Sequence, residues 1–136
     1  VYMCCMKLGY IIIYVSDVPK TVAFYETAFD LKRRFIHESH LYAEMETGST
    51  ALAFAGNEAA EMAGLGLLPN DPRTVAAGWE ICLITSDVAK AYDQAISKGC
   101  SPVAPPTEKL WGQTVSYLRA LNGYLGELAS PRRDRT

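Results

Sequence analysis

The chain has 136 residues, 49% of them apolar, and a formal net charge of −2 at pH 7. This length and composition suit one compact core, so we expect a single domain over residues 1–136. A nucleic-acid partner would require a strong basic excess, and the basic residues cluster only at Arg132, Arg133 and Arg135. We therefore expect no nucleic-acid partner, and we interpret residues 132–136 as a solvated tail.

Neither a membrane anchor nor a disulfide framework is indicated. No apolar run approaches the ~20 residues that a membrane span needs, which predicts no membrane partner and a cytoplasmic location. The four cysteines are Cys4, Cys5, Cys82 and Cys100, and they show neither a CxxC pair nor a zinc-ligand spacing. We expect them to be reduced thiols of a cytoplasmic protein.

The first half of the chain predicts a strand, a helix and three further strands. Residues 10–15 form an apolar run, and residues 18–29 place apolar side chains at helical spacing. Ser16 or Asp17 can accept hydrogen bonds from the first turn of that helix, where Pro19 is tolerated. Three strand candidates follow at residues 32–37, 42–47 and 51–55, with turns at 39–40 and 48–49.

A linker is expected at residues 57–78, which contain Gly64, Gly66, Pro69 and Pro72. Residues 58–62 within it are expected to form a short helical turn.

The second half repeats the plan of the first. The segment Ser16-Asp17-Val18-Pro19-Lys20 recurs 70 residues later as Ser86-Asp87-Val88-Ala89-Lys90. The repeat predicts a strand at 80–84, a helix at 88–98 capped by Gly99, and strands at 102–104, 114–121 and 124–129. Asn122-Gly123 is a strong hairpin signal between the last two. We thus predict two βαβββ modules, over residues 7–56 and 79–131.

The combined pattern resembles the vicinal oxygen chelate superfamily, which includes glyoxalase I, bleomycin-resistance proteins and extradiol dioxygenases. The resemblance covers residues 7–131. It implies an α+β fold in which two tandem modules form a curved mixed-sheet cleft with helices outside. The segments that carry it are Tyr10 to Val18, Ala23-Phe24-Tyr25, Ala28-Phe29, Trp79-Glu80-Ile81, Ser86-Asp87-Val88, Gly99, Trp111-Gly112-Gln113, Asn122-Gly123 and Glu127.

The resemblance also implies four metal-ligand positions, at Tyr10, Ala53, Glu80 and Glu127. A divalent ion usually needs three or four protein ligands, and only the two glutamates are suitable. We therefore predict no metal and no other cofactor; if a divalent metal is bound, Glu80 and Glu127 would be its ligands. His37 and His40 are interpreted as exposed turn histidines, with completion of an unusual metal site as the alternative.

Alternation along the strands predicts which side chains line the implied cleft. Glu127 lies among apolar neighbours, so an inward carboxylate there needs a partner: a proton, an arginine such as Arg34 or Arg119, a metal, or a cationic ligand. The aromatic candidates could instead be ordinary packing residues of their own modules. The predicted ligand-binding residues are Tyr10, Ile12, Tyr42, Ala53, Glu80, Trp111, Tyr117 and Glu127.

Carboxylates among aromatic rings favour a planar or cationic ligand. We therefore predict binding of a small organic molecule, aromatic or cationic and with antibiotics among the candidates, without metal chemistry and without an assigned catalytic residue. The alternative is a metal-dependent lyase, isomerase, dioxygenase or thiol transferase. A third reading is a metal-free enzyme with Glu80 or Glu127 as general base, which would need a raised pKa. The resemblance further implies a homodimer.

Overall fold

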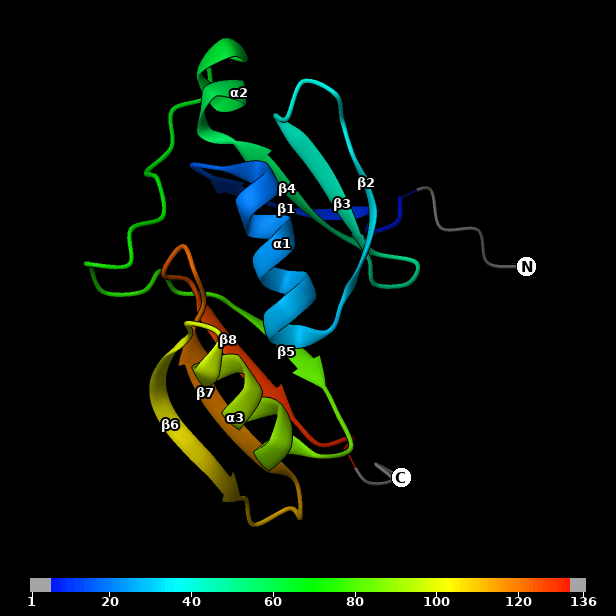
Figure 1. The fold of residues 1–136 in the computed structure, drawn as a ribbon, viewed down its shortest axis with the longest axis vertical. Helices are drawn as coiled ribbons and strands as arrows, with labels where there is room; N and C mark the ends of the chain where they lie inside the picture. The colour runs from blue at the N-terminus through cyan, green and yellow to red at the C-terminus, as the bar shows by residue number, and fades with distance from the viewer. Residues whose placement is uncertain (1–5, 133–136) are drawn as a thin grey trace. The chain divides into compact units, whose positions relative to one another are not determined.

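The computed structural model describes residues 6–132, which form two successive sets of βαβββ elements (Figure 1). The expectations for Cys4, Cys5, Arg133 and Arg135 lie outside this range. The first set is β1 (Tyr10–Val15), α1 (Val18–Phe29), β2 (Lys32–Ile36), β3 (Tyr42–Glu46) and β4 (Ala51–Gly56), followed by a short helix α2 (Asn57–Met62). The second set is β5 (Glu80–Ile84), α3 (Val88–Ser97), β6 (Ser101–Glu108), β7 (Thr114–Arg119) and β8 (Leu125–Ala129).

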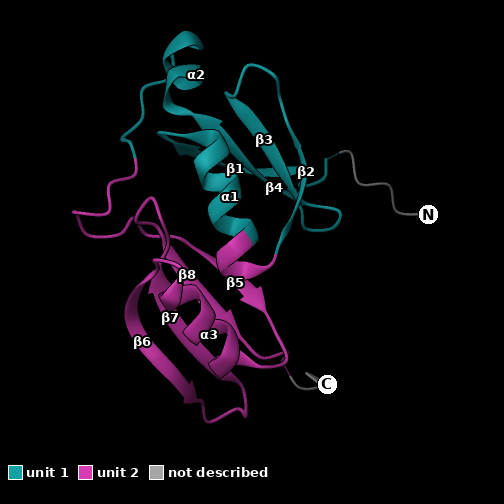
Figure 2. Ribbon diagram, viewed as in Figure 1, with its two compact units in different colours: residues 1–26, 31–69 teal, residues 27–30, 70–136 magenta. Residues whose placement is uncertain are grey.

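Both sheets have the same topology, which confirms the α+β fold with two repeated modules. The strand orders are β1-β4-β3-β2 and β5-β8-β7-β6. In each sheet the first strand pairs in parallel with the last, and the remaining pairs are antiparallel. The chain divides into two compact units, residues 1–26 with 31–69 and residues 27–30 with 70–136, and each unit contains one sheet (Figure 2).

The repeated Ser-Asp segments cap the two long helices, as predicted. The backbone N–H of Lys20 donates to Asp17 Oδ1 at 3.0 Å, and that of Lys90 donates to Asp87 Oδ1 at 3.1 Å. Each carboxylate satisfies an amide that the first helical turn leaves free. Gly99, after α3, has φ 118°, a left-handed conformation that glycine adopts without strain.

Each sheet packs one face against its own helix, and we call the opposite face its distal face. In the first module, Tyr25 of α1 is 1% exposed, and its ring lies 5.0 Å from that of Phe54 on β4. In the second, Leu118 and Leu128 are buried together with Ala95 of α3. Because side chains alternate along a strand, the residues between these core positions lie on the distal faces.

The largest departure from the predicted elements is β6. It extends over Ser101–Glu108 rather than 102–104, through Pro105 and Pro106. Proline cannot donate to a sheet ladder, but β6 is the edge strand of its sheet, where the missing N–H costs little, and its register with β7 is irregular. β7 ends at Arg119 instead of residue 121, because the chain turns before Gly123.

The second half of the linker packs on the β7–β8 hairpin. Gly123 has φ +89°, and a Cβ atom there would lie 2.4 Å from Pro72 Cα. Arg119 donates from Nε to the Gly123 carbonyl at 2.7 Å and from Nη2 to the Asp71 carbonyl at 3.3 Å. Residues 71–72 therefore pack against the second module. The first part of the linker contains α2, close to the helical turn expected at 58–62.

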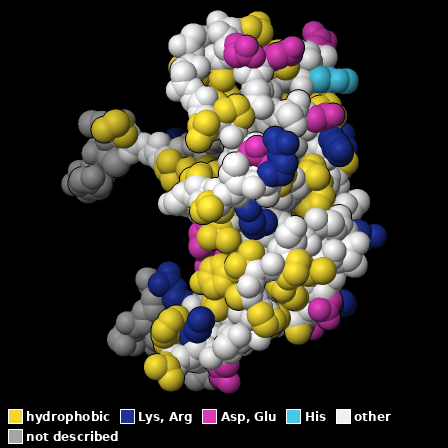
Figure 3. All heavy atoms as spheres, turned by 90° about the vertical axis from the view of Figure 1, so that its left-hand side faces the viewer, with side chains coloured by type: hydrophobic (Ala, Val, Ile, Leu, Met, Phe, Trp, Pro, Cys, Tyr) yellow, Lys and Arg dark blue, Asp and Glu magenta, His cyan; other side chains and the backbone are white. Residues whose placement is uncertain are grey.

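Among the described residues, no helix is both long and apolar enough to cross a membrane. On the face drawn in Figure 3, Lys and Arg side chains are interspersed with apolar and acidic ones.

Candidate functional site

The second distal face carries Glu80 and Cys82 of β5, Tyr117 of β7 and Glu127 of β8. Cys82 and Tyr117 are the direct register partners of Glu127 on either side, so these three side chains form one row across the sheet. Glu80 lies two residues before Cys82 and shares its face. Glu80 and Cys82 are exposed, and Glu127 and Tyr117 are partly buried. Three of the predicted ligand-binding residues therefore lie together.

Glu127 retains its proton unusually well. Burial, together with a hydrogen bond to Glu80 and the charge of that residue, raises the pKa of Glu127 to about 7. Glu127 thus lies within hydrogen-bonding reach of a second carboxyl group, Glu80, and of the Cys82 thiol. Neither arginine considered from the sequence is its partner: Arg34 binds Glu44 and Glu46, and Arg119 binds backbone carbonyls. The guanidinium groups of both arginines thus bind partners other than Glu127.

The neighbours of Glu127 are held in their neutral forms as well. Burial, followed by the charges of Glu127 and Glu80, raises the pKa of the Cys82 thiol to about 11. The same causes raise the pKa of the Tyr117 phenol above its ordinary value. At neutral pH the row therefore contains a thiol and a phenol beside an acid pair that can still release a proton.

The first distal face contains Tyr10 and Ile12 of β1, Ala53 of β4, and Tyr42 and Glu44 of β3. Ile12, Ala53 and Glu44 are successive register partners across three strands. Tyr10 is 57% exposed and Ile12 43%, so both offer surface to a ligand. Ala53 is completely buried. Its methyl group supplies packing, and the polar group at this level of the sheet is Glu44.

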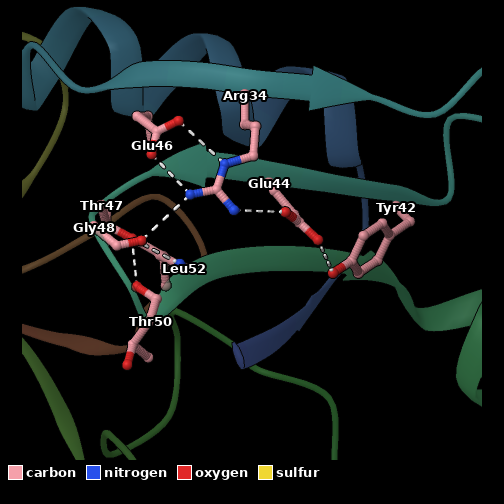
Figure 4. Close-up of polar contacts among 8 residues, drawn as sticks. All are labelled: Arg34, Tyr42, Glu44, Glu46, Thr47, Gly48, Thr50 and Leu52. Carbon is pink, nitrogen blue, oxygen red and sulfur yellow. Dashed lines mark hydrogen bonds and ion pairs between the residues drawn. The ribbon is translucent and has the colours of Figure 1, made fainter. Parts of the chain in front are cut away.

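Glu44 is the centre of a hydrogen-bonded network that the sequence did not reveal (Figure 4). Its Oε2 accepts the Tyr42 hydroxyl at 2.7 Å, and its Oε1 accepts Arg34 Nη1 at 3.1 Å. Arg34 also donates to both oxygens of Glu46 and to the Gly48 carbonyl. A register irregularity between Arg33 and Phe35 accounts for the position of Arg34, because such a bulge redirects a side chain.

The remaining sequence candidates lie in turns. Trp111 is 62% exposed, and its indole N–H donates to Gln113 Oε1 at 2.9 Å. His37 and His40 are exposed, as expected, and His37 Nδ1 lies 2.8 Å from Ser39 Oγ. These contacts are local.

The residues present do not fit the metal centre implied by the resemblance. In the part of the chain that the structure describes, no group of three or more His, Cys, Asp or Glu side chains is arranged to hold a metal ion. Of the four implied positions, Tyr10 and Ala53 bring a phenol and a methyl group. Glu80 and Glu127 bring the remaining two side chains, below the usual ligand number.

Comparison with known proteins identifies the family. Residues 7–128 match the Glyoxalase/Bleomycin resistance protein/Dioxygenase superfamily. The chain belongs to this superfamily. A search of curated proteins returned no match.

Several solved structures share the fold. A glyoxalase-related enzyme from Fulvimarina pelagi is 16% identical with a TM-score of 0.77, over 92% of this chain and 88% of that one. A glyoxalase/bleomycin resistance protein/dioxygenase family enzyme from Burkholderia phytofirmans is 20% identical, also with a TM-score of 0.77, over 92% and 98%. TioX from Micromonospora sp. ML1 is 17% identical with a TM-score of 0.67, over 92% and 98%. At these identities the similarity concerns the fold.

Proposed function

We propose that the protein binds a small cationic organic molecule with an aromatic or planar framework, and that binding takes place without metal chemistry. The observation that carries this proposal is the Glu80–Glu127 carboxyl pair on the second distal face. The ion pairs of Arg33, Arg34 and Arg73 all involve other carboxylates. A ligand cation can therefore interact with both carboxylates of this pair, while the adjacent Tyr117 ring offers a face for stacking or cation–π contact.

Isothermal titration calorimetry against a panel of basic aromatic antibiotics and planar amines tests this proposal. We expect at least one member to bind, and Glu127→Gln to weaken it roughly tenfold, the loss of about one charge-assisted contact. Glu58→Gln, which removes an exposed carboxylate on α2, is the matched control and should leave the affinity unchanged. Absence of heat across the whole panel would refute the proposal.

A second candidate function is supported by the raised pKa of Glu127 itself. A carboxyl group with a pKa of about 7 is suited to remove and return protons at neutral pH. In this candidate Glu127 is a general base for a carbon acid, with Glu80 adjusting its basicity. The protein would be incubated in D2O with a panel of carbonyl compounds, and NMR would detect deuterium incorporated beside the carbonyl. Incorporation that disappears in Glu127→Gln supports the candidate, and its absence from every compound counts against it.

We also propose that the protein is a homodimer. Strand β1 is an edge strand, and its three successive residues Tyr10, Ile11 and Ile12 are each more than two-fifths exposed. Edge strands with apolar side chains on both faces are prone to pair with another chain. Light scattering should give the mass of two chains, and Ile11→Lys should shift the mass toward that of one. A single-chain mass for the unmodified protein would contradict the proposal.

A further inference from the structure

A cavity of about 500 Å³ lies within the first module, at the end of the sheet where α1 and α2 begin (Figure 1). Its walls are the β1–α1 connection at residues 16–19, the β2–β3 turn at residues 39–41, and segment 56–61. All of these residues belong to one compact unit. The volume is in the range of small-molecule sites, and none of the ligand-binding residues predicted from the sequence lines the cavity.

The floor of the cavity is apolar, and the fold fixes its shape. Val18 is buried, and a Cβ atom at Gly56 would lie 3.0 Å from Leu41 Cδ2 and 3.9 Å from Val18 Cγ2. These three residues are therefore packed together. The Gly56 N–H donates to the Leu41 carbonyl at 2.9 Å, and the Leu41 N–H donates to Ser39 Oγ at 3.2 Å. The two hydrogen bonds hold the β2–β3 turn against the end of β4.

The rim of the cavity is acidic. Asp17 lines it together with Glu58 and Glu61, which lie on one side of α2 because they are three positions apart. No ion pair among the described residues involves these carboxylates, and Asp17 uses one oxygen to cap Lys20. His40 is the only basic side chain in the described lining. The two helix N-termini add about half a positive charge each, so the carboxylates outweigh them.

An unpaired acceptor in the wall points to a hydrogen-bond donor in the ligand. Asn57 lines the cavity, and its Oδ1 is buried without a hydrogen-bond partner among the described residues. Buried side-chain oxygens are normally paired. A ligand N–H group in the cavity is a suitable partner for this oxygen, while its other N–H groups are free to bind the carboxylates of the rim.

Two properties of the lining narrow the class of ligand. Among the described residues, no group of three or more His, Cys, Asp or Glu side chains is arranged to hold a metal ion, so the three carboxylates do not converge on one point. The described lining also contains no Phe, Tyr or Trp on which a planar ligand would stack. An aliphatic molecule with several N–H donors fits both properties, because its cationic groups can reach separate carboxylates.

We propose that this cavity is a second ligand site, which binds aliphatic amines or guanidines that carry more than one cationic group. Asp17, Glu58 and Glu61 pair with the cationic groups, and Asn57 accepts a hydrogen bond. The site lies within the first module, and the observations that carry it are independent of the Glu80–Glu127 pair.

Calorimetry with a matched pair of probes tests the second site. Agmatine carries a guanidinium and an ammonium group on a butyl chain, and 4-guanidinobutanoate has a carboxylate in place of the ammonium end. We expect agmatine to bind and to be preferred roughly tenfold, about the contribution of one charge-assisted hydrogen bond. Glu61→Gln should weaken agmatine by a similar factor. Asn57→Ala should weaken it by less, because a neutral acceptor contributes less than a charged one.

Glu38→Gln is the matched control. It removes an exposed carboxylate from the β2–β3 turn that does not line the cavity, and it should keep the affinity for agmatine. Absence of heat with agmatine, equal affinity for the two probes, or equal losses in Glu61→Gln and Glu38→Gln would each overturn the proposal. Magnesium ions that displace agmatine from the unmodified protein but do not bind Glu61→Gln would overturn the assignment to an organic cation.

The same variants separate this site from the carboxyl pair of the second module. Glu58→Gln should weaken agmatine, whereas it is expected to leave the affinity for aromatic cations unchanged. Loss of agmatine binding in Glu127→Gln but not in Glu61→Gln would place agmatine at the carboxyl pair and overturn this inference, while the proposed function would stand. Absence of binding across the aromatic panel, with agmatine bound as expected, would refute the proposed function alone.

Discussion

The two modules share one topology, but the carboxyl group on the distal face of each is stabilised in a different way. On the first distal face, Glu44 is neutralised by Arg34 and saturated by hydrogen bonds. On the second, Glu127 has a carboxyl neighbour, Glu80, and keeps a proton instead. The first arrangement is complete within the protein, whereas under the proposed function a ligand cation completes the second. The repeated scaffold therefore supports one face with an internally paired carboxylate and one face with a carboxyl pair.

The difference also bears on Ala53, one of the four metal-ligand positions that the resemblance implies. The carboxylate nearest to Ala53 is Glu44, its register partner on β3, and Arg34 already holds it. A cation at this position would have to displace a guanidinium group. The carboxylate opposite Ala53 in the first module is thus held in an internal ion pair.

Removal of Arg34 should produce the largest effect on this comparison. Arg34→Met leaves the buried Glu44 without its cation, and we expect a loss of about 2–3 kcal/mol in the free energy of unfolding, below the full value for a buried pair because Arg34 is one-third exposed. Chemical denaturation measures the loss. Arg33→Met, next in the chain but paired with Glu26 on the surface, should cause a clearly smaller loss, because solvent screens an exposed ion pair. Equal losses would show that the Glu44 pair is no different from a surface pair.

A pH series of unfolding measurements should show opposite signs for the two faces. The folded pKa of Glu127 is raised, so its unfavourable contribution develops as pH rises from about 4.5 to 7 and then stays constant, on the order of 1–2 kcal/mol. Glu127→Gln should remove this decline. The pKa of Glu46 is lowered by Arg34, so its favourable contribution is lost as pH falls through the acidic range, and Glu46→Gln should remove that loss. The same sign for both variants would contradict the comparison.

The smallest expected effect concerns the reactivity of Cys82. Its thiol is exposed, yet its pKa of about 11 leaves little thiolate at pH 8, so alkylation should be slower than for an ordinary exposed cysteine. Glu127→Gln removes a neighbouring charge and should accelerate alkylation by roughly two- to tenfold. Peptide mass spectrometry follows Cys82 separately from the other cysteines. A rate that does not respond to Glu127→Gln would place Glu127 outside the electrostatic environment of Cys82.

Local sequence signals predicted most of the fold because each had a local physical cause. The caps at Asp17 and Asp87 and the turn at Asn122-Gly123 depend on residues close in the chain, and all three are present in the structure. The sequence predicted too short a β6 because Pro105 and Pro106 normally argue against a strand. Proline is tolerated in an edge strand, and the sequence alone does not show which strand lies at the edge of the sheet.

The site could be predicted only in part, because its chemistry depends on cross-strand register. The resemblance placed Glu80 and Glu127 at one implied site, but only the cross-strand register shows that Cys82 and Tyr117 flank Glu127. The Glu44 network depends on the β-bulge between Arg33 and Phe35, and no residue type in this segment predicts a bulge. The sequence does carry one signal of this face: Tyr42, Glu44 and Glu46 alternate with the apolar Ala43 and Met45, which indicates a polar strand face.

The docking of residues 71–72 on the last hairpin has a practical consequence for engineering the chain. Pro72 contacts Gly123, and the Asp71 carbonyl accepts a hydrogen bond from Arg119. An affinity tag or reporter inserted at residues 71–72 would therefore disrupt the packing of the linker on the hairpin. Leu68, only a few residues earlier, is 93% exposed. An insertion beside Leu68 meets solvent instead of packed backbone, which makes that position the natural place to attach a fluorophore or a fusion partner.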